Sequence, residues 1–249
     1  MTSILITGAS SGIGEALAEN LGKEGHRLIL VARRETELQR VANQVRQMGG
    51  SAEIFVADLT QETDLLRLEK YIQSHPIDLL INNAGLGLYG TVTQTDSHME
   101  QKLLQLNIEA LVRLTRAILP QLQQRDGGGI LFVSSILSFM PTPYMTAYGA
   151  SKSFVLSYGT SLATELRNTN ITISVLCPGS TQSEFATRAG FNQQRTMSAE
   201  KVARIALQQF KKGKTIIIPG LQNQITSYLP RFFSPLQLAH IVARLFRNR

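Results

Sequence analysis

Two tyrosines, Tyr144 and Tyr148, lie four residues apart in the segment 144–152, and only Tyr148 is followed four residues later by a lysine, Lys152. A tyrosine side chain has a pKa of about 10, so acid or base catalysis at neutral pH benefits from a neighbouring cation that favours the phenolate. Residues four apart on a helix lie on one face, a single turn from each other. The spacing therefore predicts that Tyr148 transfers a proton and that Lys152 lowers its pKa.

Three serines that could hydrogen-bond a substrate next to Tyr148 lie at the end of the apolar run 130–135 or just after it. They are Ser134, Ser135 and Ser138. Because side chains alternate along a strand, Ser134 and Ser135 point to opposite faces, and only one of these two can meet the tyrosine.

A glycine-rich turn, with Gly8, Gly12 and Gly14 in a G-x-x-x-G-x-G pattern, separates the first apolar run from the first helical segment. Glycine allows a tight turn and lets backbone N–H groups at a helix start approach a pyrophosphate. At the first strand-to-helix junction, the pattern predicts a dinucleotide site.

The end of the second apolar run indicates which dinucleotide binds. An NAD site uses an Asp or Glu about 20 residues after the glycines to hold the ribose, whereas an arginine there accommodates a 2′-phosphate. This sequence has Ala32, Arg33 and Arg34. We therefore predict NADP(H), with Arg33 on the phosphate and Arg34 either beside it or at the solvated start of the next helix.

Two further run ends carry groups that suit a nucleotide. Asp58 and Leu59 offer a carboxylate and a backbone N–H to an adenine, although an Asp in this place also caps a following helix. Asn83, Ala84 and Gly85 follow the fourth run, where small residues let a ribose or adenine lie close to the backbone.

Seven apolar runs that do not alternate with polar residues predict strands buried on both faces. They cover 4–7, 27–32, 53–58, 78–82, 130–135, 172–177 and 215–220. Segments with helical periodicity lie between them, at 13–24, 35–48, 97–119, 147–167 and 198–210. The alternation predicts one α/β domain over 1–249, a doubly wound parallel sheet between two layers of helices.

The strand ends and the segment AYGASK at 147–152 together resemble the short-chain dehydrogenase/reductase family, over about residues 3–220. The resemblance implies a seven-stranded Rossmann-type sheet, a nicotinamide cofactor and catalysis by an Asn, a Ser, a Tyr and a Lys. By position these are Asn107, Ser135, Tyr148 and Lys152. The resemblance also implies that Lys152 binds the nicotinamide ribose and that Asn107 holds a water linking Lys152 to solvent.

The resemblance continues after the sixth run, where Pro178 and Gly179 match the family's Pro-Gly. Ser183 stands where the family often has a threonine, and Ser11 stands where many NADP-dependent members have a basic residue. The full set of expected cofactor-binding residues is Gly8, Ser10, Ser11, Gly12, Ile13, Gly14, Arg33, Arg34, Asp58, Leu59, Asn83, Ala84, Gly85, Tyr148, Lys152, Pro178, Gly179, Thr181 and Ser183.

Apolar residues around this site predict a small apolar ketone or aldehyde as the substrate rather than a sugar. The expected substrate contacts are Ser135, Leu137, Tyr144 and Phe185. Further candidates for the pocket wall, about half of which we expect to pack elsewhere, are Leu86, Leu88, Tyr89, Phe139, Met140, Pro143, Met145 and Phe191.

Composition excludes several other classes. A single cysteine, Cys177, rules out an intrachain disulfide and a Cys-rich zinc site and fits a cytoplasmic protein. The four histidines have no metal-ligand spacing, so we predict no metal site. The first apolar run is too short for a signal peptide or a membrane span. The net charge is +7, but no nucleic-acid-binding motif accompanies it, and we predict no nucleic-acid partner.

A helical extension is expected from about residue 222, in a region, 201–249, that contains nine Lys or Arg and no Asp or Glu. Leu238, Ile241, Val242 and Leu245 have the spacing of one apolar helix face. The alternatives are a lid over the pocket, a dimer contact and an interfacial membrane helix. We favour a lid or a dimer contact, because buried stripes are commoner, and we expect a homodimer or homotetramer.

The sequence as a whole predicts an NADPH-dependent carbonyl reductase in which Tyr148 is the general acid and base. A 3-oxoacyl-thioester reductase of lipid synthesis is the alternative among enzymes. A non-catalytic NADP-binding redox sensor is the alternative of another class, and the presence of Ser135, Tyr148 and Lys152 argues against it.

Overall fold

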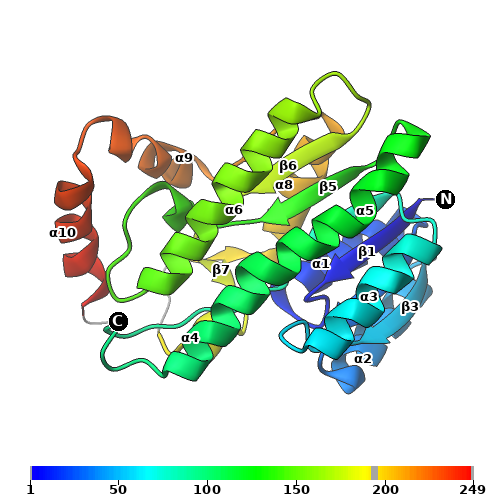
Figure 1. Cartoon of the computed structure of the whole chain (residues 1–249), viewed down its shortest axis with the longest axis horizontal. Coiled ribbons are helices and arrows are strands. Elements are labelled where there is room, and N and C mark those ends of the chain that lie inside the picture. Colours follow the sequence, from blue (N-terminus) through cyan, green and yellow to red (C-terminus); the bar gives the residue numbers. More distant parts are fainter. Residues whose placement is uncertain (1, 192–195, 248–249) are drawn as a thin grey trace.

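The computed structural model describes residues 2–191 and 196–247, and in this part of the chain seven parallel strands form one sheet in the order β3-β2-β1-β4-β5-β6-β9 (Figure 1). The strands are β1 (Ser3–Thr7), β2 (Arg27–Ala32), β3 (Ser51–Val56), β4 (Leu79–Asn82), β5 (Gly129–Val133), β6 (Thr172–Leu176) and β9 (Ile216–Ile217). Each of the seven apolar runs became one of these strands. The predicted Rossmann-type α/β fold is confirmed.

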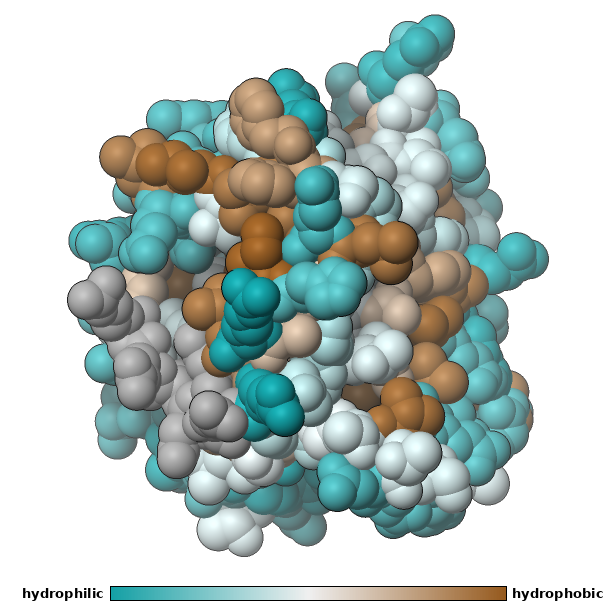
Figure 2. Space-filling model, turned by 90° about the vertical axis from the view of Figure 1, so that its left-hand side faces the viewer, coloured by the Kyte–Doolittle hydropathy of each residue, from teal (hydrophilic) through white to brown (hydrophobic). Residues whose placement is uncertain are grey.

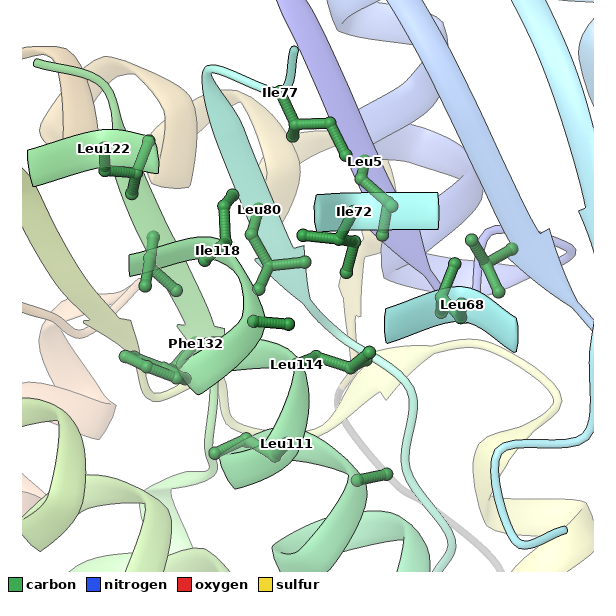
Figure 3. Close-up of a cluster of buried hydrophobic side chains, with 14 of the residues drawn as sticks. Leu5, Leu68, Ile72, Ile77, Leu80, Leu111, Leu114, Ile118, Leu122 and Phe132 are labelled. Carbon is green, nitrogen blue, oxygen red and sulfur yellow. The ribbon is translucent and has the colours of Figure 1, made fainter. Parts of the chain in front are cut away.

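Helices cover both faces of the sheet, which explains why β1, β4 and β5 are buried along their whole length. One face packs against α3 (Glu62–Ser74), α5 (Leu111–Arg125) and α6 (Thr146–Glu165). The other packs against α1 (Gly12–Lys23), α2 (Glu35–Gln47) and α8 (Ala199–Lys211). Figure 3 shows leucines and isoleucines of α3 and α5 converging on Leu5, Leu80 and Phe132 of the strands.

The strand order reverses next to β1, which pairs with β2 on one side and with β4 on the other. At such a point the connections leave in opposite directions, and a crevice opens beyond the carboxyl ends of the strands. The segments that follow β1, β4, β5 and β6 therefore meet at one edge of the sheet.

The predicted helix at 97–119 is not continuous. It consists of α4 (Ser97–Leu104), a π-helical segment η1 (Gln105–Ala110) and then α5. The sequence also did not predict a two-stranded sheet of β7 (Thr181–Gln182) and β8 (Met197–Ser198), nor the short helices η2 (Ile136–Phe139) and α7 (Phe185–Ala189). These elements hold the segments that follow β5 and β6.

Beyond β9 the chain forms α9 (Leu221–Ser227), a short 3-10 helix η3 (Leu229–Arg231) and α10 (Pro235–Phe246), drawn in orange and red in Figure 1. The predicted apolar face of α10 is partly wrong. Leu238 and Val242 are buried together with Phe246, whereas Ile241 and Leu245 are exposed. The row with a spacing of four residues packs inward, and the neighbouring row of the same helix turns outward.

Close packing of α6 on the sheet yields a stability prediction. A Cβ on Gly159 would lie 2.4 Å from Val175 Cγ2 and 3.1 Å from Phe132 Cδ2, so Gly159→Ala must push the helix away from the sheet. We expect a loss of about 1–3 kcal/mol in the free energy of unfolding, measured by urea denaturation.

The matched control is Gly127→Ala, whose Cβ would have only Arg125 O nearby, at 3.9 Å. This change should stay within about 0.5 kcal/mol. Equal stabilities of the two variants would contradict the packing that the structure describes.

Candidate active site

A cleft of about 480 Å³ lies along the carboxyl ends of the strands, a size usual for small-molecule sites. All of the residues predicted to bind the cofactor line it except Gly14, and so do Ser135, Leu137 and Phe185 of the other predicted site residues. Asn107 and Tyr144 are not among its lining residues. Predicted site residues that are up to 177 positions apart in the chain thus meet in one cavity, as the strand ends predict.

The glycine-rich turn brings the start of α1 to the cleft. Gly8 and Gly12 have φ angles of +67° and +61°, which favour glycine, and a Cβ on Gly14 would lie 2.3 Å from Gly8 O. Gly14 therefore serves close packing within the turn. Ser11 precedes α1 without a side-chain cap, so the first N–H groups of the helix have no side-chain acceptor there and suit the phosphates of a dinucleotide.

Asn83 supports this turn. Its Nδ2 donates to Thr7 O at 2.8 Å and to Gly8 O at 3.1 Å, and its backbone N–H donates to Thr7 Oγ1 at 3.0 Å. The side-chain amide protons are therefore directed at the protein backbone. Although Asn83 lines the cleft, its side chain acts by holding the glycine-rich turn in place.

The two arginines after β2 differ in their partners. Arg33 is half exposed and its nearest acid is Asp58, with 3.8 Å between Nη1 and Oδ2. Arg34 is engaged by Glu184 at 3.1 Å and by Ser10 Oγ at 3.4 Å. Arg33 is therefore the less constrained of the two cations and the one better able to turn toward a phosphate.

Because the N-cap of α3 is Gln61, Asp58 does not cap this helix, and one of the two interpretations that the sequence leaves open is wrong. Asp58 Oδ1 accepts hydrogen bonds from Thr60 N at 3.1 Å and from Thr60 Oγ1 at 2.8 Å, so it shapes the turn after β3. The residue also lines the cleft, together with Leu59. The carboxylate thus lies at the nucleotide end of the cleft with one oxygen held by the turn.

Tyr148 lies in the first turn of α6 and is buried beside Phe185, with 5.3 Å between the ring centroids. Burial raises the pKa of Tyr148 to about 12, and a hydrogen bond with the Ser135 side chain acts in the opposite direction. The phenol is therefore protonated at neutral pH, as a proton donor to a substrate must be.

Lys152 is one helical turn further on, and its Nζ lies 5.8 Å from the centre of the Tyr148 ring. The ammonium donates to Val133 O at 2.9 Å, and burial lowers the pKa of Lys152 to about 8. The predicted Tyr148–Lys152 pair is present, but the pKa of Tyr148 does not shift in the direction that the sequence predicts. Desolvation by burial is the main cause of the Tyr148 shift, and the tyrosine pKa rises instead of falling.

Asn107 lies in the π-helical segment, where its side chain is fully buried. Its Oδ1 accepts from Leu86 N at 2.8 Å, and its Nδ2 donates to Leu86 O at 2.9 Å and to Ser151 Oγ at 3.0 Å. A Cβ on Gly85 would lie 3.3 Å from both Asn107 Oδ1 and Lys152 Nζ. The missing side chain at position 85 leaves the amide and the ammonium on either side of one small space.

The structure distinguishes the three serines that could hydrogen-bond a substrate next to Tyr148. Ser134 Oγ donates to Lys152 O at 2.8 Å, and Ser138 Oγ donates to the backbone oxygen of Ser135. Ser135 Oγ accepts from Leu137 N at 3.2 Å, which leaves its O–H directed to Tyr148 or to a ligand. Ser134 and Ser138 thus hold α6 and the turn after β5, and Ser135 faces the cleft.

The end of the cleft next to Tyr148 is apolar. Of the wall residues expected from the sequence, Leu86, Leu137, Met145, Phe185 and Phe191 line it. The other aromatic and aliphatic candidates do not line the cleft and pack in the hydrophobic cluster around Tyr148, Leu238 and Val242. They include Leu88, Tyr89, Phe139, Met140 and Tyr144.

Tyr144 has a φ angle of +65°, and its ring centroid lies 6.4 Å from that of Tyr89. The left-handed backbone is unusual for a tyrosine and turns the loop before α6. Tyr144 is not among the residues that line the cleft, which does not support its predicted contact with the substrate.

The sequence did not predict several residues of the site, and three of them are polar or aromatic groups that a ligand could meet. Arg188 and Phe246 line the cleft, and Asn223 of α9 lies against Gly179, where a Cβ would come within 2.4 Å of its Oδ1. Phe246 continues the four-residue spacing of Leu238 and Val242, so that a longer helix prediction could have found it. Nothing local to Asn223 or Arg188 indicates where they lie.

Residues 2–194 match the family model described as short chain dehydrogenase. A short-chain dehydrogenase from Sphingobium yanoikuyae, solved in complex with NADPH, has a TM-score of 0.86 and 33% identity, over 100% of this chain and 96% of that one. A bulky-bulky ketone specific alcohol dehydrogenase from Comamonas testosteroni has a TM-score of 0.82 and 31% identity, over 94% and 95% of the two chains. The ketoacyl reductase HetN of Nostoc sp. is 31% identical over 239 residues, covering 92% of this chain and 82% of the relative.

The buried hydrogen bonds of Asn107 yield a second stability prediction. Asn107→Ala leaves the N–H and C=O of Leu86 without these partners, so we expect a loss of about 1–3 kcal/mol in the free energy of unfolding. Urea denaturation measures it against Asn43→Ala, an exposed position on α2 that should cost no more than about 0.5 kcal/mol. A loss no larger than that of the control would mean that Asn107 does not hold Leu86.

Proposed function

The chain belongs to the short-chain dehydrogenase/reductase family, and from this premise we propose that it is an NADP(H)-dependent reductase of apolar ketones or aldehydes. Members of the family are oxidoreductases that act on CH–OH and C=O groups, and this chain is one of them. The observation that carries the proposal is a single cleft that runs from the glycine-rich turn and Arg33 to Ser135, Tyr148 and Lys152.

The residues at the nucleotide end fit a dinucleotide with a 2′-phosphate. The uncapped start of α1 suits the pyrophosphate, and Arg33 offers a guanidinium that is only loosely paired. The relative from Sphingobium yanoikuyae, which was solved with NADPH, supports the same choice. When bound, the reduced nicotinamide supplies the hydride.

At the other end, the protein's own residues perform the proton chemistry. Ser135 donates a hydrogen bond to the substrate carbonyl and orients it toward Tyr148. Tyr148, which burial keeps protonated, donates its proton to the oxygen on which negative charge develops. The ammonium of Lys152 lies close enough to stabilise the phenolate that is left, and its remaining N–H bonds can hold the ribose.

Asn107 completes the proposed proton path. Its Oδ1 and Lys152 Nζ each lie 3.3 Å from the point where a Cβ on Gly85 would stand, a distance that a bridging water could span. A water held there would return a proton to Lys152 and Tyr148 after each turnover. The π-helical segment serves this role because it turns the amide of Asn107 inward.

The apolar wall at the Tyr148 end supports a lipophilic carbonyl substrate, and so does the ketone specificity in the name of the relative from Comamonas testosteroni. A 3-oxoacyl thioester is the second candidate. It is favoured by the ketoacyl reductase HetN. Arg188 is a cation at the cleft that is paired with Glu184, and it would have to exchange this partner to meet a phosphate-bearing carrier. The single, buried cysteine supports a reducing compartment such as the cytoplasm.

The proton-donor role of Tyr148 is tested by Tyr148→Phe. We expect NADPH-dependent reduction of bulky ketones to fall by at least about 100-fold while NADPH binding, followed by fluorescence, is retained. The control, Tyr144→Phe, should keep turnover because this ring lies outside the cleft. Activity that survives in Tyr148→Phe would rule the mechanism out, and a preference for 3-oxoacyl thioesters in the same assay would select the second substrate class.

The phosphate-binding role of Arg33 is tested by Arg33→Ala. Loss of a charge-assisted hydrogen bond should raise KM for NADPH by about 10-fold or more and leave KM for NADH unchanged. Arg34→Ala should have the smaller effect of the two, because Glu184 already engages Arg34. Steady-state kinetics with both cofactors would disprove the assignment if Arg33→Ala weakened NADH and NADPH equally.

A further inference from the structure

We propose that the C-terminal helical unit, residues 221–247, docks the protein on the surface of a membrane that contains anionic phospholipid. The unit comprises α9, η3 and α10 and lies on the face that Figure 2 turns toward the viewer. The proposal goes beyond the reductase activity and does not depend on it, because docking requires neither cofactor nor turnover.

The exposed apolar side chains of the molecule concentrate in this unit. Six of them are exposed by more than half, namely Leu221, Ile225, Tyr228, Phe232, Leu236 and Leu245. In the rest of the chain that the structure describes, Val92 is the only large apolar side chain exposed to that extent. Figure 2 shows brown side chains projecting on this face among teal ones. Such a concentration indicates a surface that is covered by something apolar.

These side chains are not a core that failed to form. The inner row of α10, Leu238, Val242 and Phe246, is already buried in the cluster that contains Tyr148. The start of the helix is fixed by a capping box between Ser234 and Gln237. The outer row of α10, Ile241 and Leu245, is therefore left exposed by a helix whose position is determined without it. One face of α10 covers the cleft through Phe246, and another exposes apolar side chains.

The charge of the region selects an anionic partner. Residues 201–249 contain nine Lys or Arg and no Asp or Glu. Three of the arginines, Arg231, Arg244 and Arg247, belong to the unit, and the guanidinium of Arg231 lies 4.9 Å from the centre of the Tyr228 ring. Apolar side chains flanked by arginines are the composition that binds at the headgroup level of anionic membranes.

The same charge argues against a second copy of this chain on this face. A two-fold contact would place the basic unit against itself, and the unit has no carboxylate with which to pair the opposing arginines. A phospholipid surface supplies both the apolar layer and the phosphates. None of the helices in the part of the chain that the structure describes has the length and hydropathy of a membrane span.

Docking in this orientation would connect the membrane with the substrate end of the cleft, a consequence that rests on the proposed function. Phe246 lines the cleft, and its backbone oxygen accepts a hydrogen bond from the Tyr89 hydroxyl. The inner row of α10 thus covers the apolar end where the carbonyl would react, while the outer row would touch the lipid. A lipophilic substrate could pass from the bilayer to the cleft along α10.

The test is sedimentation of the full chain with vesicles of phosphatidylcholine alone and of phosphatidylcholine with phosphatidylserine. We expect at least about 10-fold tighter binding to the anionic vesicles, weakened by salt. The double variant Phe232→Ser/Leu236→Ser should lose at least about 10-fold in affinity. Arg231→Gln/Arg244→Gln should lose about five-fold for each arginine on anionic vesicles only.

Val92→Ser is the matched control, an exposed apolar residue outside the unit, and it should bind like the parent chain. Circular dichroism and NADPH oxidation with a water-soluble ketone verify that the variants are folded, since none of the changed residues lines the cleft.

Absence of vesicle binding by the folded parent chain would overturn the proposal, as would equal binding by Phe232→Ser/Leu236→Ser. Sedimentation equilibrium tests whether a second copy of this chain covers the face instead. A parent chain that is dimeric and does not bind vesicles, and that Phe232→Ser/Leu236→Ser converts to a monomer, would assign the face to a second copy. A folded protein that binds vesicles but oxidises no NADPH would refute the proposed function and leave the docking intact.

Discussion

Burial of both faces of the parallel sheet is the constraint on which the rest of the structure depends. Because α1, α2 and α8 cover one face and α3, α5 and α6 the other, a ligand can approach the strands only at their ends. The reversal of strand order beside β1 opens the carboxyl end, and there the glycine-rich turn, the arginines after β2 and the start of α6 meet. The fold thus brings the residues proposed to bind the nucleotide and those proposed to donate the proton into one cavity.

Burial also sets the protonation states within that cavity. It raises the pKa of Tyr148 and lowers that of Lys152, so the phenol keeps its proton and the ammonium gives its proton up more readily than a solvated lysine would. The raised pKa of Tyr148 favours proton donation to a carbonyl near neutral pH, whereas the lowered pKa of Lys152 restricts the proposed reaction to pH values at which Lys152 is still charged. The π-helical segment contributes at the same place, because it carries Asn107, whose amide bonds to Leu86 and borders the space beside Lys152.

The sequence was most informative where chemistry depends on local spacing. Each strand end and the Tyr148–Lys152 pair could be predicted, because apolar runs and helical periodicity determine which positions reach the sheet edge. What it could not provide are properties set by distant contacts. The inward turn of Asn83, the contact of Asn223 with Gly179 and the direction of the Tyr148 pKa shift all depend on residues far away in the chain.

The pH dependence of kcat/KM for NADPH-dependent ketone reduction tests the central claim most directly. The account requires a protonated Tyr148, which its raised pKa guarantees through the accessible range, and a charged Lys152, whose pKa is about 8. Between about pH 6 and pH 10, kcat/KM should stay constant on the acid side and fall once Lys152 loses its proton above about pH 8. A value of kcat/KM that rises with pH through this range would contradict the account, because it would require a base where the structure holds a proton donor.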